Sequence, residues 1–241
     1  MPNHVTTRCL VNGPDAAVEE FRKRAFRIEN GELVFDFNAF IPMPSAIRDT
    51  QSGSTAEQGA ALLCIVRDRA PPAGCSSFGT GYGELRDATI TNMREELGMP
   101  KATLKQVAEA WLAKHPKYAT EGEKQLRAIT ETGFPDWYEW SIRYWGTKWN
   151  AYHFRITTER PLEFVFDTAW DFPEPVFKAI ADAFPELTFR CSCFDEGWGF
   201  AGDGYFNLCE RGQWQFGPCE ATDQLYELVY GYEPESEGGA V

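Results

Sequence analysis

The chain has 241 residues, 43% hydrophobic and 24% charged, a composition that supports a buried core and excludes a disordered chain. Its 23 basic and 36 acidic residues give a net charge of −13, which argues against the basic surface of a nucleic-acid-binding protein. No apolar run approaches the roughly 20 residues of a membrane span, and the N-terminus lacks signal-peptide features. We therefore expect a cytoplasmic protein of one or two domains, without a membrane segment.

The first 44 residues predict a small α+β unit. Apolar residues alternate from Val5 to Val11, as in a strand, and an Asn-Gly-Pro-Asp turn follows, whose Asp15 is expected to cap a helix. Residues 18–25 have helical spacing of apolar side chains, and residues 33–37 predict a second strand that ends before two prolines.

The segment 45–135 predicts a helical insertion. Apolar residues from Leu104 to Leu112 recur at helical spacing. Thr120 to Glu123 has the spacing of a capping box, which indicates a helix start, and Gly133 is placed where a C-terminal cap is expected.

Strand patterns resume after the insertion. Residues 151–156 and 162–167 are short β-rich runs, and two prolines at 173 and 175 suit the first turn of a helix that extends to Phe184. Residues 187–193 alternate as a half-buried strand, and glycines interleaved with aromatic residues at 197–206 predict a hairpin. The whole pattern predicts an α+β fold, in which an antiparallel or mixed sheet carries two helices on one face.

Seven cysteines are expected to be reduced thiols in the cytosol. Cys191 and Cys193 lie two residues apart in the alternating run, so both sulfurs would point to one face of the strand. Cys209 and Cys219 could complete a metal site, but the spacing matches no zinc pattern. We expect buried, small apolar side chains instead, and predict neither a metal nor a cofactor.

Several strings along the chain resemble the YubB-type ferredoxin-like family, which is carried largely on bacterial plasmids, phages and other mobile elements. These strings are MPNHVT (1–6), FDFN (35–38), IPMP (41–44), YWGTKWNAY (144–152), FDTAW (166–170) and DEGWGFAG (195–202). The resemblance implies a ferredoxin-like fold but no established activity. With the patterns above it predicts a ferredoxin-like core of residues 1–44 and 136–232, the helical insertion 45–135, and a flexible acidic tail 233–241.

Half of the eight tryptophans fall within thirteen residues, between Trp137 and Trp149. Such rings can form a recognition surface, stack on the bases of a single-stranded nucleic acid, or pack the insertion against the sheet. Packing is favoured for most of them, but the polar residues among them are harder to explain in this way. The predicted binding surface consists of Trp145, Thr147, Lys148, Trp149, Asn150, Trp170, Asp195, Glu196 and Trp198.

Carboxylates near predicted strand ends suggest an alternative, a metal-assisted hydrolase. Paired carboxylates can bind a divalent metal or act as general acid and base. The residues for this alternative are Asp167, Asp195 and Glu196, beside Lys148 and Asn150. The chain has few histidines to support it, although His4 and His153 would meet if the first strand neighboured the strand at 151–156.

Acidic residues are concentrated at the C-terminal end. From Asp195 onward ten acidic residues stand against Arg211 alone, which accounts for −9 of the net charge of −13. This asymmetry suggests either a solubilising face or an acidic surface for a basic partner. The leading hypothesis is a non-catalytic mobile-element protein that binds a basic host protein, as a counter-defence inhibitor of a nuclease or CRISPR-type complex. Direct single-stranded nucleic-acid binding through the tryptophans is the third hypothesis, disfavoured by the negative charge.

Overall fold

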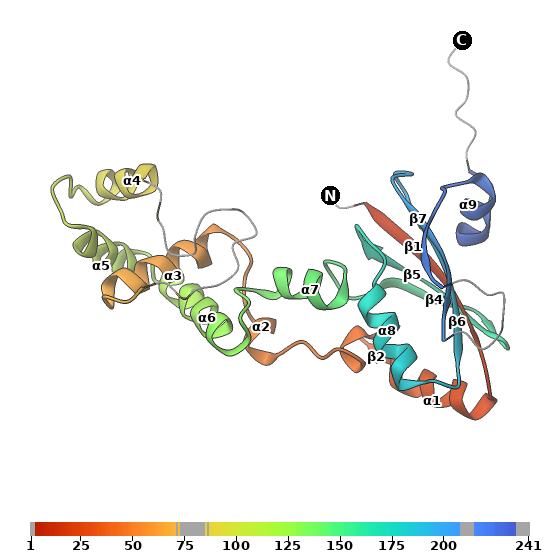
Figure 1. The fold of residues 1–241 in the computed structure, drawn as a ribbon. Coiled ribbons are helices and arrows are strands. Elements are labelled where there is room, and N and C mark those ends of the chain that lie inside the picture. Colours follow the sequence, from red (N-terminus) through yellow and green to blue (C-terminus); the bar gives the residue numbers. More distant parts are fainter. Residues whose placement is uncertain (1–2, 71, 73–84, 86, 208–214, 235–241) are drawn as a thin grey trace, which may run out of the picture. The chain divides into compact units, whose positions relative to one another are not determined.

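The structure is a computed structural model, which describes residues 3–70, 72, 85, 87–207 and 215–234 (Figure 1). The chain divides into two compact units. Unit 1 comprises Met1–Pro42 with Ser141–Val241, and unit 2 comprises the continuous segment Met43–Trp140. The sequence patterns place the corresponding boundaries near 45 and 135. Most of the predicted acidic tail, residues 235–241, lies outside the described residues.

Unit 1 is built on a six-stranded sheet in which every strand pair between neighbours is antiparallel. In sheet order the strands are β4 (Tyr152–Glu159), β5 (Leu162–Ala169), β1 (His4–Asn12), β6 (Thr188–Asp195), β7 (Ala201–Phe206) and β8 (Gly217–Cys219). The N-terminal strand β1 therefore lies inside the sheet, between two strands from the C-terminal half of the chain.

The alternation of β1 assigns its side chains to two faces. Val5, Cys9 and Val11 are buried on one face, which helices α1 (Asp15–Ala25) and α8 (Glu174–Ala183) cover. The rings of Phe21 from α1 and Phe177 from α8 both pack against Phe189 of β6. Asp15 was expected to cap α1, but Pro14 occupies the N-cap and Asp15 is the first helical residue. There its carboxylate interacts favourably with the positive end of the helix dipole.

Helix α9 (Asp223–Tyr230) covers part of the opposite face (Figure 1). It packs on Phe194 of β6, which is paired with Thr6 and therefore points away from the core that contains Val5. The strand expected at 33–37 is observed as β3 (Glu32–Phe35), outside the main sheet. It pairs with β2 (Phe26–Glu29) in a separate two-stranded sheet. A short 3-10 helix, η1 (Phe37–Ala39), follows it.

In the described part of unit 2, residues 43–140 form helices and connecting segments only. The helices are α2 (Ser45–Arg48), α3 (Ser54–Val66), α4 (Asp87–Leu97), α5 (Leu104–Lys114) and α6 (Pro116–Thr132), and α7 (Trp137–Trp145) crosses the boundary to unit 1. The predicted helix at 104–112 is confirmed as α5. It begins with a capping box between Thr103 and Gln106. Leu62, Met93 and Trp111 contribute to the core of this unit.

The start of α6 was wrongly predicted at Thr120. The helix begins at Pro116, and Thr120 lies inside it with its hydroxyl donating to the carbonyl of Pro116. Gly122 does not belong to a capping box; it allows α6 to approach α3. A Cβ at this position would lie 2.4 Å from the carbonyl carbon of Gly59 in α3. Two helices can approach so closely only where neither carries a side chain. The expected C-terminal cap at Gly133 is confirmed by its φ of 80°.

The cysteines of the sheet are buried among apolar side chains. Cys9, Cys191 and Cys193 have no exposed surface, and the sulfurs of Cys9 and Cys191 lie 3.7 Å apart as free thiols. Burial raises the pKa of Cys193 and of Cys191 well above that of an ordinary thiol. Cys75 and Cys209 lie outside the described residues. None of the helices in the described ranges has the length and hydropathy that a membrane crossing requires.

Candidate functional site

Several residues of the predicted binding surface have internal partners. Trp145 is buried, and its indole N–H donates to the carbonyl oxygen of Ile41 at 2.9 Å. Thr147 is also buried, where its hydroxyl donates to the carbonyl of Ala169 and accepts from the amide of the same residue. Both side chains hold the segment between α7 and β4 in place.

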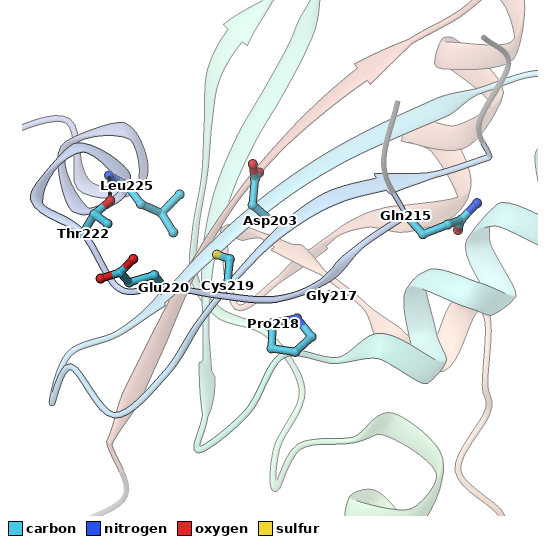
Figure 2. Close-up of a pocket in the computed structure, with 8 residues that line it drawn as sticks. All are labelled: Asp203, Gln215, Gly217, Pro218, Cys219, Glu220, Thr222 and Leu225. Atoms are coloured by element: carbon cyan, nitrogen blue, oxygen red, sulfur yellow. Dashed lines mark hydrogen bonds between the residues drawn. The ribbon is translucent and has the colours of Figure 1, made fainter. Parts of the chain in front are cut away.

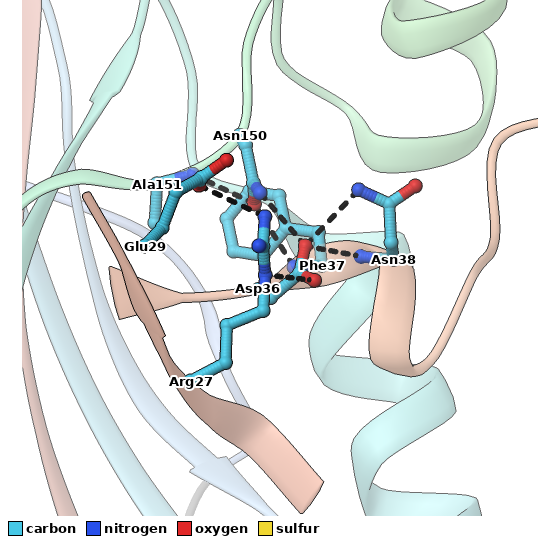
Figure 3. A network of polar contacts seen from close by, with 7 residues as sticks. All are labelled: Arg27, Glu29, Asp36, Phe37, Asn38, Asn150 and Ala151. Atoms are coloured by element: carbon cyan, nitrogen blue, oxygen red, sulfur yellow. Dashed lines mark hydrogen bonds and ion pairs between the residues drawn. The ribbon is translucent and has the colours of Figure 1, made fainter. Parts of the chain in front are cut away.

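Asn150 belongs to a polar network inside unit 1 (Figure 3). Its amide oxygen accepts from the backbone N–H of Phe37 at 2.9 Å, and its amide nitrogen donates to Asp36 Oδ1 at 2.8 Å. Asp36 also accepts from the side chains of Asn38 and Arg27. Burial acts to raise the pKa of Asp36, but these hydrogen bonds and the guanidinium outweigh it, and the pKa is lowered. The network joins the start of η1 to the segment before β4.

Lys148, Trp149 and Trp170 remain at the surface. The two indoles are 38% and 43% exposed, and the Lys148 ammonium lies 4.5 Å from the ring centre of Trp149 and 4.8 Å from that of Trp170. Cation–π attraction therefore orders this part of the predicted surface. Trp149 also contacts the ring of Tyr152, which in turn packs against His4 of the pocket described next.

A pocket of about 370 Å³ lies on the sheet face that carries α9. We call it the α9-face pocket. Strands β1, β4 and β5, the turn after β6, and α9 with the residues that follow it all contribute to it. Its lining residues are His4, Thr6, His153, Asp167, Glu196, Trp198, Tyr226, Tyr230 and Tyr232.

The two imidazoles of this pocket lie near each other, with ring centres 6.2 Å apart. From the sequence, the two histidines were expected to meet if their strands were neighbours. In the structure β5 lies between β1 and β4. The rings approach because the register of β4 on β5 shifts between Tyr152 and Arg155, and His153 in this irregular stretch has a φ of 50°.

Hydrogen bonds orient both imidazoles through Nδ1. Burial, together with Asp167 and Glu196, raises the pKa of Tyr152 to about 12, so its hydroxyl keeps its single proton. Two acceptors lie within reach of that proton, Nδ1 of His4 at 2.7 Å and the carbonyl of Thr168 at 3.1 Å, so His4 Nδ1 either accepts from the hydroxyl or donates to it. Asp167 accepts from Nδ1–H of His153, at 2.8 Å. In the neutral form of His153, Nε2 is left as an acceptor.

The three carboxylates of the hydrolase alternative separate into two groups. Asp167 and Glu196 both line the α9-face pocket, where Thr6 donates to Asp167 at 2.7 Å and the His4 amide donates to Glu196 at 2.8 Å. Asp195 is buried and accepts from the backbone N–H of Gly199 at 2.8 Å, inside the turn between β6 and β7. Within the described ranges no group of three or more His, Cys, Asp or Glu side chains could hold a metal ion.

Aromatic rings form one wall of the pocket. Trp198 stacks on Tyr226 with an interplanar angle of 11° and ring centres 5.5 Å apart, and Tyr226 contacts Tyr230 at 4.3 Å. Trp198 is 42% exposed and Tyr232 is 57% exposed. The hydroxyl of Tyr230 is buried without a partner that meets hydrogen-bond geometry in the described residues. Burial raises the pKa of this tyrosine, against a smaller lowering from the nearby Thr6 hydroxyl.

Unusual backbone conformations coincide with these side chains. Among the described non-glycine residues with positive φ, four are Asn, Asp or His, types that are enriched in this region. The others are Trp170 and Trp198, with φ of 73° and 59°. Bulky residues held in the left-handed region cost of order 1–3 kcal/mol each and are concentrated at functional sites. Trp198 lines the α9-face pocket.

The tyrosines of α9 were not predicted as site residues. Leu225, Tyr226, Val229 and Tyr230 have helical spacing after Thr222, whose side chain caps α9 by accepting from the Leu225 amide. This pattern was available in the sequence and predicts a helix there, but not the face of the sheet that it covers.

Two further pockets have less to offer a ligand. One, of about 390 Å³, lies beside β7 and β8, with Asp203, Cys219 and Glu220 in its lining (Figure 2). Asp203 is already engaged there, because it accepts from Ser192 at 2.6 Å. The other, of about 410 Å³, lies in unit 2, where Arg67 is paired with Glu123.

Part of the chain resembles a described domain family. No curated protein matches the sequence. A solved structure, that of protein Api92 from Yersinia pseudotuberculosis, aligns with 92% of this chain and 99% of its own at 13% identity and a TM-score of 0.42. A family model described as "Ferredoxin-like domain in Api92-like protein" matches residues 144–229, which run from the end of α7 into α9. The α+β class and the ferredoxin-like fold expected from the sequence are confirmed, and residues 144–229 are similar to the ferredoxin-like domain of Api92-like proteins.

Proposed function

We propose that the protein is a non-catalytic binding protein, which recognises a basic protein through the α9-face pocket and the acidic surface around it. The observation that carries the proposal is the chemistry of the pocket lining. Two carboxylates and a wall of aromatic rings share one opening, and among the described residues that line it none is Lys or Arg. Such a lining attracts cations and repels anions.

The charge around the pocket supports the same partner. Glu227 on α9 and Glu233 after it are exposed, and the chain as a whole carries a net charge of −13. Complementary charge speeds the encounter with a basic protein and makes the affinity dependent on salt. The same charge disfavours the nucleic-acid hypothesis, because a phosphate backbone would meet Asp167 and Glu196 in the pocket.

The finer proposal concerns the partner's role. The resemblance to the YubB-type family, which is carried on plasmids and phages, suggests a host protein as partner. A host nuclease or CRISPR-type complex has a basic groove for nucleic acid, and an acidic protein that occupies such a groove would act as a counter-defence inhibitor. The hydrolase alternative has weaker support, since Asp195 is separated from the other two carboxylates by its position in the β6–β7 turn.

The test compares two variants with the same change in net charge. The first replaces Glu196, Glu227 and Glu233 with glutamine. The control replaces exposed carboxylates elsewhere, by Glu20→Gln, Asp182→Asn and Glu186→Gln. A basic protein captured from bacterial lysate at low salt would be purified, and its affinity for each variant measured at low and high salt.

We expect the first variant to bind roughly tenfold more weakly at low salt, as about 1.4 kcal/mol of lost attraction implies. The control should retain the affinity of the unchanged chain, because its charges lie on another surface. An affinity that is insensitive to salt, or equal losses in both variants, would contradict the proposal.

A further inference from the structure

We propose that the α9-face pocket is a recognition site for the guanidinium group of an arginine side chain. The inference deepens the proposed function and rests on it for the source of the arginine, which is the basic protein partner. The pocket itself is argued from the hydrogen-bonding capacity of its side chains and from its aromatic wall.

His153 supplies an acceptor. It gives its Nδ1 proton to Asp167, at 2.8 Å. The remaining ring nitrogen of the neutral histidine, Nε2, therefore carries a lone pair and no proton. A ligand beside this ring has to donate a hydrogen bond to it.

The carboxylates add charge to this acceptor. Glu196 is oriented by the hydrogen bond from the His4 backbone, which leaves its second oxygen, Oε2, with full acceptor capacity. Asp167 is held by Thr6 and His153 and is only 15% exposed. Its negative charge is therefore fixed at the base of the pocket, where it is screened less than a surface charge.

The aromatic wall favours a flat cation. Trp198 and Tyr226 are nearly parallel, and Trp198 keeps 42% of its surface exposed. A guanidinium is planar, stacks on such rings, and carries five N–H donors and no acceptor. An ammonium group is compact and strongly hydrated, and it presents no face to stack. The combination of π faces with acceptors therefore matches arginine better than lysine.

The pocket is arranged before any ligand arrives. Its volume of about 370 Å³ is in the lower part of the range of roughly 300–1,000 Å³ for small-ligand sites. Trp198 is held with a φ of 59°, a conformation that bulky residues adopt only where the surrounding fold imposes it. A site fixed in this way loses little conformational entropy on binding.

The experiment uses the full chain and three capped tripeptides. These are acetyl-Gly-Arg-Gly-amide, its lysine counterpart, and its citrulline counterpart, which has nearly the shape of arginine without the charge. The chain has three histidines, and His115 lies in unit 2. Imidazole NMR signals therefore report on the pocket through His4 and His153 and contain an internal control in His115.

We expect the arginine peptide to shift the signals of His4 and His153 in a saturable manner, and to leave His115 unchanged. The lysine and citrulline peptides should bind at least several-fold more weakly. Glu196→Gln should weaken arginine binding about tenfold, whereas the matched control Glu186→Gln should not change it. Nitrogen shifts of the free protein should show Nε2 of His153 without a proton when the ring is neutral.

Equal affinity for arginine and citrulline, equal affinity for arginine and lysine, or a shift of His115 equal to the others would each overturn the assignment. The two proposals fail separately. If the arginine peptide binds at Glu196 but no basic protein is captured, the proposed function is wrong and the pocket assignment holds. If the combined change of Glu196, Glu227 and Glu233 weakens binding of a basic protein but the arginine peptide does not bind, the pocket assignment is wrong and the proposed function holds.

Discussion

Replacing Gly122 by alanine tests the close contact between helices α3 and α6. An added Cβ would lie 2.4 Å from the carbonyl carbon of Gly59 and 2.5 Å from the amide nitrogen of Ala60, whereas ordinary contacts begin at 3.4 Å. Both neighbours are backbone atoms, so no side chain can rotate away. The two helices would have to separate by about 1.0 Å, the difference between 2.4 and 3.4 Å.

The sign of the stability change in Gly122→Ala distinguishes the helix contact from the higher helix propensity of alanine. Alanine is favoured over glycine in a helix interior by about 1 kcal/mol, so without the contact the variant would be more stable. Overpacking costs about 1–3 kcal/mol, and three backbone contacts under 3.0 Å indicate the upper part of that range. We therefore expect a net loss of about 1–2 kcal/mol in the free energy of unfolding of unit 2.

Far-UV circular dichroism at increasing temperature and in urea measures this loss, because unit 2 contributes many of the helices. The expected decrease in Tm is about 5–15 °C for a unit of this size. Thr120→Ala, two residues away on the exposed side of α6, is the control and should change stability by less than about 0.5 kcal/mol. A Gly122→Ala protein that is more stable than the unchanged chain would refute the helix contact.

Three further outcomes are expected. The pKa of Asp36 is lower in the folded state than its unfolded value near 3.8. The Asp36 carboxylate therefore stabilises the fold above the unfolded pKa, and this contribution is lost as pH falls through the folded pKa. Asp36→Asn should flatten this part of the curve of unfolding free energy against pH. Among the described cysteines, Cys219 should react fastest with a thiol reagent, while Cys191 and Cys193 react only after unfolding, as mass spectrometry of labelled peptides would show. Phe177→Ala should lower the free energy of unfolding by about 3–5 kcal/mol in urea titrations, because the ring is fully buried; a loss below 1 kcal/mol would contradict the described core.

Local patterns were sufficient to predict most elements of unit 1. Period-two alternation places Val5, Cys9 and Cys193 on buried strand faces, and each of these side chains is buried in the structure. Prolines 173 and 175 mark the start of α8 correctly. These signals are local, because burial on one face of a strand or helix requires a fixed spacing in the sequence.

The site depends on distances that the sequence does not contain. Asn150 was expected at a binding surface because it is polar and lies among tryptophans, yet Asp36 and Phe37, more than a hundred residues earlier, satisfy its side chain. His4 and His153 meet through an irregularity in β4 that no pattern in the sequence indicated. Such features follow from strand order and register, which tertiary packing decides.

The central place of β1 has a consequence for the order of events during synthesis. The carbonyl of Val5 in this strand accepts from the hydroxyl of Thr168, 163 residues later in the chain. Unit 2 is continuous from 43 to 140 and can fold on the ribosome, whereas β1 has no partner strand until β5 and β6 have been made. Its unpaired edges are exposed to aggregation during this interval. The α9-face pocket joins His4 to Tyr232, so a chain that stops before α9 cannot bind through it.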